Sequence, residues 1–428
     1  MKKILILALS CLFFTGFSQE KKDIEPMYPT YKGLIMAGYQ GWFRAEGDEA
    51  NRGWGHFGRG NKFNPENNTI DIWPDVSEYK KTYETEFLYE DGTPAKVFSS
   101  VDESTTDLHF KWMKEYGVDG VFMQRFFGVT KSAERAKTSN LILKNAFKAS
   151  QKYDRAIAVM YDLSGLQPGG NCQSVIDDWK RLVDDLKVLD FGKKQTYLHH
   201  NNKPLVTIWG VGFPDRSYDI SKIGLDKLID FLKDDPVYGG CSVMLGVPTY
   251  FRDLNKDCLP DPFLHEVIES ADIVLPWMVQ RFTPLVHKPM DYLRDHIKED
   301  IAWSKEHGVD YAPIACPGFS WRNLSLNNPG LARYTAYGAI PRLGGQFFWD
   351  QMVTMVDAGA EMIYVAMFDE IDEGTAIFKV SDNPPNSDKA HFIDNDGAPS
   401  DQHLFLTGEA GKMLRKERAT SYEMPDRK

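Results

Sequence analysis

The chain has 428 residues, of which 42% are hydrophobic and 13% aromatic, and its formal net charge is −11. This length suits one barrel-type domain enlarged by loops, because such barrels exceed the average domain size as single units. The negative charge excludes the basic surface that nucleic-acid binding needs, so we expect no nucleic-acid partner. It also weighs mildly against heavily sulfated or uronic polysaccharides, although a local basic pocket can override the overall balance.

Residues 1–18 are predicted to be a secretory signal peptide. Lys2 and Lys3 precede an apolar run over 4–14, and small residues follow up to Ser18. A basic start, an apolar centre and a small-residue end are typical of a signal that is removed on export. We therefore expect a secreted or periplasmic protein.

The protein could also be attached to a membrane, either by a lipid anchor or by a membrane span. Cys11 has a lipobox-like neighbourhood, but cleavage there leaves an apolar core of only about seven residues, which is short for a signal. Lipid anchoring at Cys11 is therefore the less favoured alternative. No other run approaches the roughly 18 apolar residues that a membrane span needs, so we expect no membrane span.

Apolar runs rich in β-branched and aromatic residues alternate with amphipathic stretches of helical length. The strands are predicted at 33–40, 120–124, 156–162, 205–209, 242–247, 273–278, 311–315 and 362–367. The helices are predicted near 104–116, 132–152, 173–189, 221–233, 261–270, 291–307, 345–358 and 401–416. This alternation favours an α/β fold, a closed (β/α)8 TIM barrel. An open doubly wound sheet is the alternative, but no glycine-rich phosphate loop follows the first strand, where that fold often has one.

The connection after the first strand, residues 41–101, is much longer than a usual loop between a strand and a helix. It contains Trp42, Trp54, Phe57 and Trp73, and this aromatic content argues against disorder. Long connections are usually functional, and in a barrel this one lies at the catalytic face. We expect it to form a wall that covers the substrate.

The chemistry of a barrel gathers where its strands end. The residues at or just after these ends are rich in rings, amides and charges, and we single out Tyr39, Gln40, Trp42, Gln124, Arg125, Asp162, Trp209, Tyr250, Arg252, Trp277, Trp321 and Asp369. Flat rings stack on the apolar faces of sugars while polar groups bind the hydroxyls, so we expect these residues to bind a polysaccharide or oligosaccharide. For any single ring, the alternative is that it caps the barrel core.

Four carboxylates follow the last strand within five residues. They are Asp369, Glu370, Asp372 and Glu373. Crowding at a barrel rim raises the pKa of some carboxyl groups, so that one stays protonated as an acid while another acts as a base. Because glycoside hydrolysis uses paired carboxylates, Glu370 and Glu373 are predicted to be catalytic. The alternative is a solvated acidic turn.

The run 368–375 resembles the signature of glycoside hydrolase family 99, commonly Phe-Asn-Glu-Trp-x-Glu-Gly-Thr, and matches its two glutamates, its glycine and its threonine. Residues 98–120 resemble the opening helix and second strand of that family, and residues 38–42 resemble its aromatic first strand. Parts of the barrel are more weakly similar to family 71 glucanases. Asp369 and Ile371 depart from the signature, which has Asn and Trp there, so the sugar and the linkage stay open.

The resemblance implies that residues 19–428 form a single (β/α)8 glycoside hydrolase-like catalytic domain. Family 99 comprises retaining, endo-acting α-mannosidases and mannanases. Carried over, Glu370 would deprotonate the sugar 2-hydroxyl, which attacks C1 to give a 1,2-anhydro intermediate, and Glu373 would protonate the leaving oxygen and later activate water. No metal or organic cofactor is implied. Tyr250 could hydrogen-bond Glu370 and tune it, or be an ordinary rim tyrosine.

Two further interpretations remain beside an α-mannan hydrolase. One is a glycosidase acting on another sugar, such as an α-glucan or a xylose- or arabinose-containing glycan. The other is a barrel that binds carbohydrate without turnover, since a fold does not dictate activity. Intact glutamates at both predicted catalytic positions argue against the second.

The four cysteines outside the predicted signal peptide indicate no catalytic mechanism. Cys172, Cys241, Cys258 and Cys316 show neither CxxC spacing nor a neighbouring group of histidines, so we expect no zinc site. Cys241 and Cys316 lie in or beside apolar strands, which favours small core residues over a disulfide.

Overall fold

The computed structural model describes residues 25–326 and 336–427. The predicted signal peptide, with Cys11, lies outside the described residues. None of the described helices combines the length and the apolar composition that crossing a bilayer requires.

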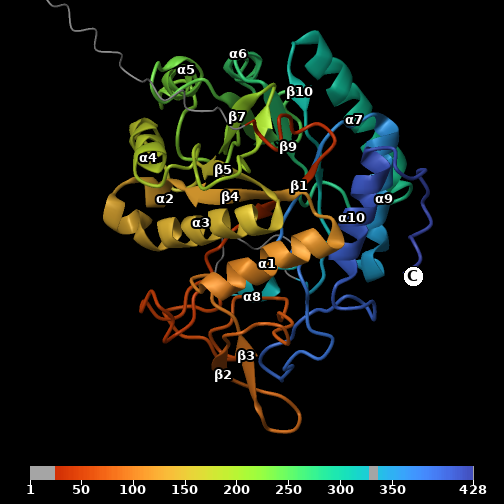
Figure 1. Cartoon of the computed structure of the whole chain (residues 1–428). Helices are drawn as coiled ribbons and strands as arrows, with labels where there is room; N and C mark the ends of the chain where they lie inside the picture. Colours follow the sequence, from red (N-terminus) through yellow and green to blue (C-terminus); the bar gives the residue numbers. More distant parts are fainter. Residues whose placement is uncertain (1–24, 327–335, 428) are drawn as a thin grey trace, which may run out of the picture.

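A parallel barrel forms the core, and its strands follow one another in chain order (Figure 1). They are β1 (Ile35–Tyr39), β4 (Gly120–Phe126), β5 (Ala156–Asp162), β7 (Lys203–Trp209), β8 (Ser242–Pro248), β9 (Ile273–Trp277), β10 (Asp310–Tyr311), β11 (Ile314–Ala315) and β12 (Ile363–Val365). Every residue of β5 and of β8 is buried, because the interior of the barrel covers one face and the helices cover the other. These strands therefore read as continuous apolar runs.

The seventh strand of the barrel is divided, and this division lets the barrel close. β10 pairs with β9, whereas β11 pairs with β12, which in turn pairs with β1. Pro313 lies between the two halves and has no N–H to donate, but its carbonyl accepts a hydrogen bond from the Tyr364 N–H at 2.9 Å. The predicted (β/α)8 barrel is confirmed.

Helices surround the barrel at the predicted places (Figure 1). They are α1 (Glu103–Tyr116), α3 (Ala133–Tyr153), α4 (Gln173–Asp184), α5 (Leu225–Asp234), α6 (Phe263–Glu269), α7 (Pro289–Glu306), α9 (Gln346–Ala358) and α10 (Gln402–Leu414). In α4, Val175, Trp179 and Leu182 recur at helical spacing and are buried, which is the pattern of a helix packed on a sheet by one face.

Several short elements were not predicted. They are β6 (His199–His200), α2 (Phe127–Thr130), α8 (Arg322–Ser325) and the 3₁₀ turn η2 (Leu343–Gly345). Segments of two to four residues are too short to show a hydrophobic period, so the sequence pattern does not reveal them.

The connection between β1 and α1 folds into a layer of its own. It contains the antiparallel hairpin of β2 (Tyr83–Leu88) and β3 (Pro94–Val97), drawn below α1 in Figure 1. Around the hairpin, the ring of Phe63 lies 4.9 Å from that of Phe87 and 5.7 Å from that of Trp73, measured between centroids.

Most of the aromatic residues named in this connection pack within the layer, and the expected substrate-covering wall stays a prediction. Trp54 and Phe57 each lie 5.2 Å from Phe63, so they and Trp73 pack within the layer. Trp42 differs, because it lines the cavity described below. Aromatic rings in this long connection thus serve mainly as a small core for the connection itself.

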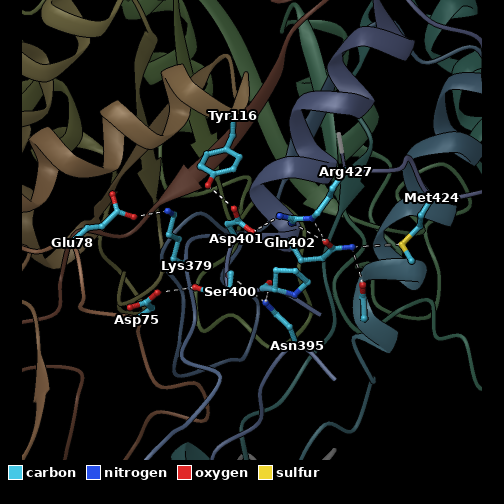
Figure 2. Close-up of polar contacts among 12 residues, drawn as sticks. Asp75, Glu78, Tyr116, Lys379, Asn395, Ser400, Asp401, Gln402, Met424 and Arg427 are labelled. Atoms are coloured by element: carbon cyan, nitrogen blue, oxygen red, sulfur yellow. Dashed lines mark hydrogen bonds and ion pairs between the residues drawn. The ribbon is translucent and has the colours of Figure 1, made fainter. Parts of the chain in front are cut away.

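Polar contacts tie the end of the chain to the barrel (Figure 2). Arg427 donates to Asp401 Oδ1 at 2.6 Å and to Gln402 Oε1 at 2.9 Å. Asp401 also accepts a hydrogen bond from the Tyr116 hydroxyl at 2.5 Å. The start of α10 is therefore held against the end of α1 and against the C-terminal segment.

The same view shows how the segment after β12 meets the first connection (Figure 2). Lys379 forms an ion pair with Glu78 at 2.5 Å, and Ser400 donates to Asp75 Oδ2 at 3.0 Å. Both contacts join residues more than 300 positions apart in sequence. They tie the layer of the first connection to the segment that follows β12.

The cysteines are free thiols buried in the protein. This holds for Cys172, Cys241, Cys258 and Cys316. The favoured interpretation of Cys241 and Cys316 as small core residues is confirmed.

Candidate active site

The segment after β12 forms a tight turn that carries the predicted catalytic carboxylates. The Met367 N–H donates to the Thr375 carbonyl and the Thr375 N–H to the Glu370 carbonyl, both at 3.0 Å. Gly374 has φ of 67°, and a Cβ there would lie 2.8 Å from the Ser320 nitrogen. The turn therefore needs glycine at this position, both for its conformation and for the close approach of Ser320.

Arg342, which the sequence analysis did not single out, supports this turn from inside the protein. It is fully buried and donates to the Gly374 carbonyl at 3.0 Å and to the Ala376 carbonyl at 2.9 Å. Burial and the Arg342 charge hold the pKa of His403 well below its usual range, so its neutral ring can accept from Arg342 at 2.9 Å. A single arginine in a loop gives no sequence signal for this role.

Glu370 lies in the cavity almost without solvent contact, with 2% of its surface exposed. Its Oε2 accepts a hydrogen bond from Gln40 Nε2 at 2.7 Å. Its Oε1 is buried and accepts from no donor in the part of the chain that the structure describes, and its carboxyl group lies beside that of Asp372. Burial, followed by the negative charge of Asp372, raises the pKa of Glu370 well above its usual value.

Glu373 lines the same cavity from the other end of the turn. Burial, followed by the charge of Asp372, raises its pKa to about 8. A carboxyl group with this pKa is protonated at neutral pH and can donate a proton. The two glutamates therefore face the same cavity, and Glu373 holds a proton there at neutral pH.

Asp369 faces the protein instead of the cavity. Its carboxylate accepts from the backbone N–H of Gln40 at 2.7 Å and from that of Gly41 at 2.9 Å. Burial nevertheless raises its pKa to about 7, since the two N–H donors offset only part of the desolvation. Asp369 thus ties the end of β12 to the end of β1 and positions Gln40 next to Glu370.

Two further aspartates connect the turn to the first connection. Asp71 accepts hydrogen bonds from the Ser320 hydroxyl and from the N–H groups of Arg322 and Asn323 at 2.5, 2.7 and 2.8 Å, and burial raises its pKa to about 6. Asp372 Oδ2 lies 3.6 Å from His56 Nδ1. The residues of the long connection therefore contact the carboxylate turn directly.

The cavity has a volume of about 460 Å³ and opens at the carboxyl ends of the strands. That volume lies within the range of about 300–1,000 Å³ that is usual for ligand pockets. Aromatic rings form part of its wall: Trp209 and Trp277 pack edge to face with centroids 5.2 Å apart, and Arg216 lies over Trp209. Indole walls with scattered polar groups are suited to a sugar.

Several polar atoms of this lining have no hydrogen-bond partner among the residues described. They are Gln40 Oε1, Glu370 Oε1 and the indole N–H groups of Trp42 and Trp209. Buried polar groups are normally satisfied, so such atoms mark where a ligand or water completes the bonding.

The cavity brings together most of the predicted sugar-binding residues. Its lining includes Gln40, Trp42, Gln124, Asp162, Trp209, Trp277 and Trp321 together with both glutamates. It also includes residues that the sequence analysis missed, among them Phe126, Met160, Phe213, Asp215 and Arg216. Phe126 lies two residues past the strand predicted at 120–124 and could have been found by extending that strand, whereas Arg216 comes from a loop without a pattern.

Five predicted residues do not line the cavity, because each is used by a partner inside the protein. They are Tyr39, Arg125, Tyr250, Arg252 and Asp369. The Tyr39 hydroxyl lies 2.8 Å from His109 Nδ1, and Arg125 pairs with buried Asp178.

Tyr250 and Arg252 likewise turn toward α7. The Tyr250 hydroxyl lies 2.9 Å from that of Tyr292, so the expected hydrogen bond to Glu370 is not formed. Arg252 donates to Glu299 at 2.7 Å and to Asp300 at 3.2 Å. Its carboxylate partners hold the guanidinium away from the cavity.

Within residues 25–326 and 336–427, no three His, Cys, Asp or Glu side chains come together in an arrangement that could hold a metal ion. The carboxylates at the rim point to different neighbours, as described above.

Comparisons with known proteins give a likeness of structure. The sequence matches no protein-family model and no curated protein. The structure is similar to that of the GH99 endo-α-mannosidase from Bacteroides thetaiotaomicron in complex with bis-tris-propane, with a TM-score of 0.63 and 15% identity over 92% of this chain and 100% of that one. Another structure of a GH99 endo-α-mannosidase from the same organism gives a TM-score of 0.59 and 15% identity, over 90% of this chain and 99% of that one. The resemblance predicted from the sequence is confirmed for the fold.

Proposed function

We propose that this chain is a secreted retaining glycoside hydrolase that cleaves an α-linked glycan, namely an α-mannan or another mannose-containing polysaccharide. One observation carries the proposal: two glutamates with raised pKa values face a tryptophan-lined cavity at the carboxyl ends of the barrel strands. The likeness of fold to GH99 endo-α-mannosidases supports the choice of substrate.

In the first step of the proposed reaction, Glu370 removes the proton from the 2-hydroxyl of the sugar at the cleavage site. The 2-oxygen attacks C1 as the bond from C1 to the leaving oxygen breaks, and Glu373 gives its proton to that oxygen. The product is a 1,2-anhydro sugar. Protonated Glu373 suits the acid role because burial raises its pKa to about 8.

In the second step, Glu373 takes a proton from water and the water oxygen attacks C1. The bond between C1 and the 2-oxygen breaks, and Glu370 returns its proton to the 2-oxygen. Two inversions at C1 leave the configuration retained. The raised pKa of Glu370 suits this exchange with a hydroxyl, because a stronger base removes a weakly acidic proton more readily.

Gln40 supports this reaction by hydrogen-bonding the Glu370 carboxylate. Its Nε2 donates to Glu370 Oε2 at 2.7 Å, which favours the ionised form and fixes the carboxylate. The free indole N–H groups of Trp42 and Trp209 and the edge-to-face rings of Trp209 and Trp277 would orient the sugar.

The test is the release of reducing sugar from a panel of α-mannans, α-glucans and xylose- or arabinose-containing glycans by the mature protein. Glu370→Gln and Glu373→Gln keep the side-chain shape but remove the acid–base capacity. Glu115→Gln, an exposed glutamate on α1, is the matched control. We expect wild type and control to cleave an α-mannan, with an α-configured first product by NMR, and both cavity variants to be almost inactive.

Other outcomes separate the alternatives. Cleavage of a different glycan, still dependent on both glutamates, would replace only the substrate. Glycan binding by wild type without any cleavage would overturn the enzyme proposal in favour of a carbohydrate-binding barrel.

Export is part of the proposal and has its own test. Mass spectrometry of the protein from the producing cell should give a mature chain that starts near Gln19. A lipid-modified chain that starts at Cys11 would show membrane anchoring instead.

A further inference from the structure

A second cavity adjoins the catalytic one. It has a volume of about 310 Å³ and shares Gln40, Trp42, Gln124 and Phe126 with the lining of the catalytic cavity. We call it the arginine cavity, because Arg44 and Arg52 also line it, together with His56. None of the residues that line it carries a carboxylate.

Arg44 enters this cavity with part of its bonding capacity unused. Its Nη1 is buried and makes no hydrogen bond, and no carboxylate lies within ion-pair distance of the guanidinium in the described chain. The group lies over Gly55, where a Cβ would be only 2.5 Å from Nη2, so glycine is what admits the arginine to this position.

Asp48 is the acidic residue whose charge acts on Arg44, but its carboxylate already accepts hydrogen bonds from other groups. The charge of Asp48 acts on Arg44, but the oxygens of Asp48 accept from the Ala45 and Ala50 N–H groups and from the Ser99 hydroxyl at 3.2, 2.9 and 2.8 Å. Asp48 therefore does not complete the bonding of the guanidinium.

Arg52 adds a second positive charge to the same cavity. It is exposed and forms no ion pair with any residue in the described ranges, and its charge acts unfavourably on Arg44. Two neighbouring guanidinium groups that form no ion pair within the described chain repel each other, and a bound anion would relieve this repulsion.

We propose that the arginine cavity binds an acidic substituent of the glycan, a sulfate, phosphate or carboxylate group, on a sugar next to the one in the catalytic cavity. This inference rests on the proposed function and specifies its substrate class. Arginine suits the task because its planar guanidinium binds such oxyanions through two parallel hydrogen bonds. Trp42 lines both cavities and stacks on His56 with centroids 3.8 Å apart, so one chain of sugars can pass from one cavity to the other along this ring.

The experiment measures binding to the full-length mature protein carrying Glu370→Gln, which is inactive under the proposal and leaves the arginine cavity intact. Isothermal titration calorimetry compares a neutral α-mannan oligosaccharide with the same oligosaccharide carrying one sulfate, one phosphate or one glucuronate. At least one acidic form is expected to bind about tenfold more tightly than the neutral form, because a hydrogen-bonded ion pair contributes more than a neutral contact. Raising the salt concentration should reduce this difference.

Arg44→Gln and Arg52→Gln in the same background locate the site. Each is expected to remove most of the tenfold preference and to leave the affinity for the neutral oligosaccharide unchanged. Arg294→Gln, at a partly exposed arginine on α7 that pairs with Asp291 and Asp295, is the matched control. Arg52 is exposed, so its replacement keeps the test valid even if the Arg44 variant fails to fold.

Equal affinity for neutral and acidic oligosaccharides, or no binding of any acidic form, would overturn the inference. So would an acidic preference that survives both arginine replacements. Which of the three acidic forms binds best identifies the substituent. If wild type hydrolyses the glycan but the protein shows no preference for acidic oligosaccharides, only this inference is overturned. If acidic oligosaccharides bind through the two arginines but wild type hydrolyses none of the glycans, the proposed function is overturned and the anion-binding site remains.

Discussion

Two groups of buried carboxyls meet at the catalytic end of the barrel, and they differ in what they face. Glu370 and Glu373 face the cavity, and one oxygen of Glu370 is left without a partner in the described chain. Asp369 and Asp71 face the protein, and each accepts at least two hydrogen bonds from it. All four have raised pKa values because all are removed from water.

This comparison shows that burial and a raised pKa do not by themselves identify a catalytic carboxyl. What separates the two groups is hydrogen-bonding capacity left open toward a cavity, because only such a group can exchange a proton with a substrate. Replacing a cavity-facing group should change activity and spare stability. Replacing a protein-facing group should lower stability, and at Asp369 it should also disturb Gln40, which contacts Glu370.

The largest expected effect is on catalysis by Glu373→Gln. Loss of the proton donor should reduce kcat by about 10²–10⁴-fold, the usual contribution of acid–base catalysis. The melting temperature should not fall, because glutamine removes a carboxyl that burial disfavours in its charged form. A circular dichroism melt and an initial-rate assay decide this; an unfolded variant, or one with near-normal kcat, would contradict the assignment.

The protein-facing counterpart is Arg125, which was predicted to bind sugar and is instead buried beside Asp178. Arg125→Met leaves the buried Asp178 carboxylate with only Arg181 and the Tyr161 hydroxyl, each at 3.1 Å, so we expect a loss of about 1–3 kcal/mol in the free energy of unfolding. Urea denaturation measures it. The double variant Arg125→Met, Asp178→Leu removes both charges and should recover much of the loss, which a substrate-binding role would not predict.

The sequence predicted the barrel well and its side-chain partners poorly, for one physical reason. Strands such as β5 are buried on both faces, so their apolar character is visible without knowing any partner. The carboxylate turn was visible too, because its residues are adjacent in the chain. Both are local patterns.

Partners that come from distant segments were not visible. Arg125 and Arg252 sit at strand ends as expected, but Asp178 and Asp300 come from helices 53 and 48 positions away. The same applies to Arg342, which reaches Gly374 from 32 positions away. An arginine at a rim can face substrate or a helix, and only the three-dimensional packing decides.

A smaller effect is expected on the pH dependence of stability. The pKa of Glu373 is raised to about 8 in the folded protein, above its value in the unfolded chain, so its stabilising contribution is complete below the unfolded pKa and is lost as pH rises through about 8. The stability of wild type relative to Glu373→Gln should therefore decrease from pH 5 to pH 8.5. Melting temperatures of both proteins across this range measure the difference, and a constant or rising difference would show that the folded pKa is not raised.

The smallest effect is expected for Tyr250→Phe, which removes a hydroxyl that contacts only the Tyr292 hydroxyl among the described residues. That pair is exposed, so its loss should change the free energy of unfolding by less than about 1 kcal/mol. If Tyr250 stays turned toward α7 when substrate binds, kcat and its pH profile should match wild type. If Tyr250 instead turns to Glu370 in the complex, the Tyr250→Phe variant should have a lower kcat and an unchanged KM. The Tyr292→Phe variant, which leaves the Tyr250 hydroxyl in place, should then keep the wild-type kcat. The pair of variants therefore tests whether the division between cavity-facing and protein-facing groups survives substrate binding.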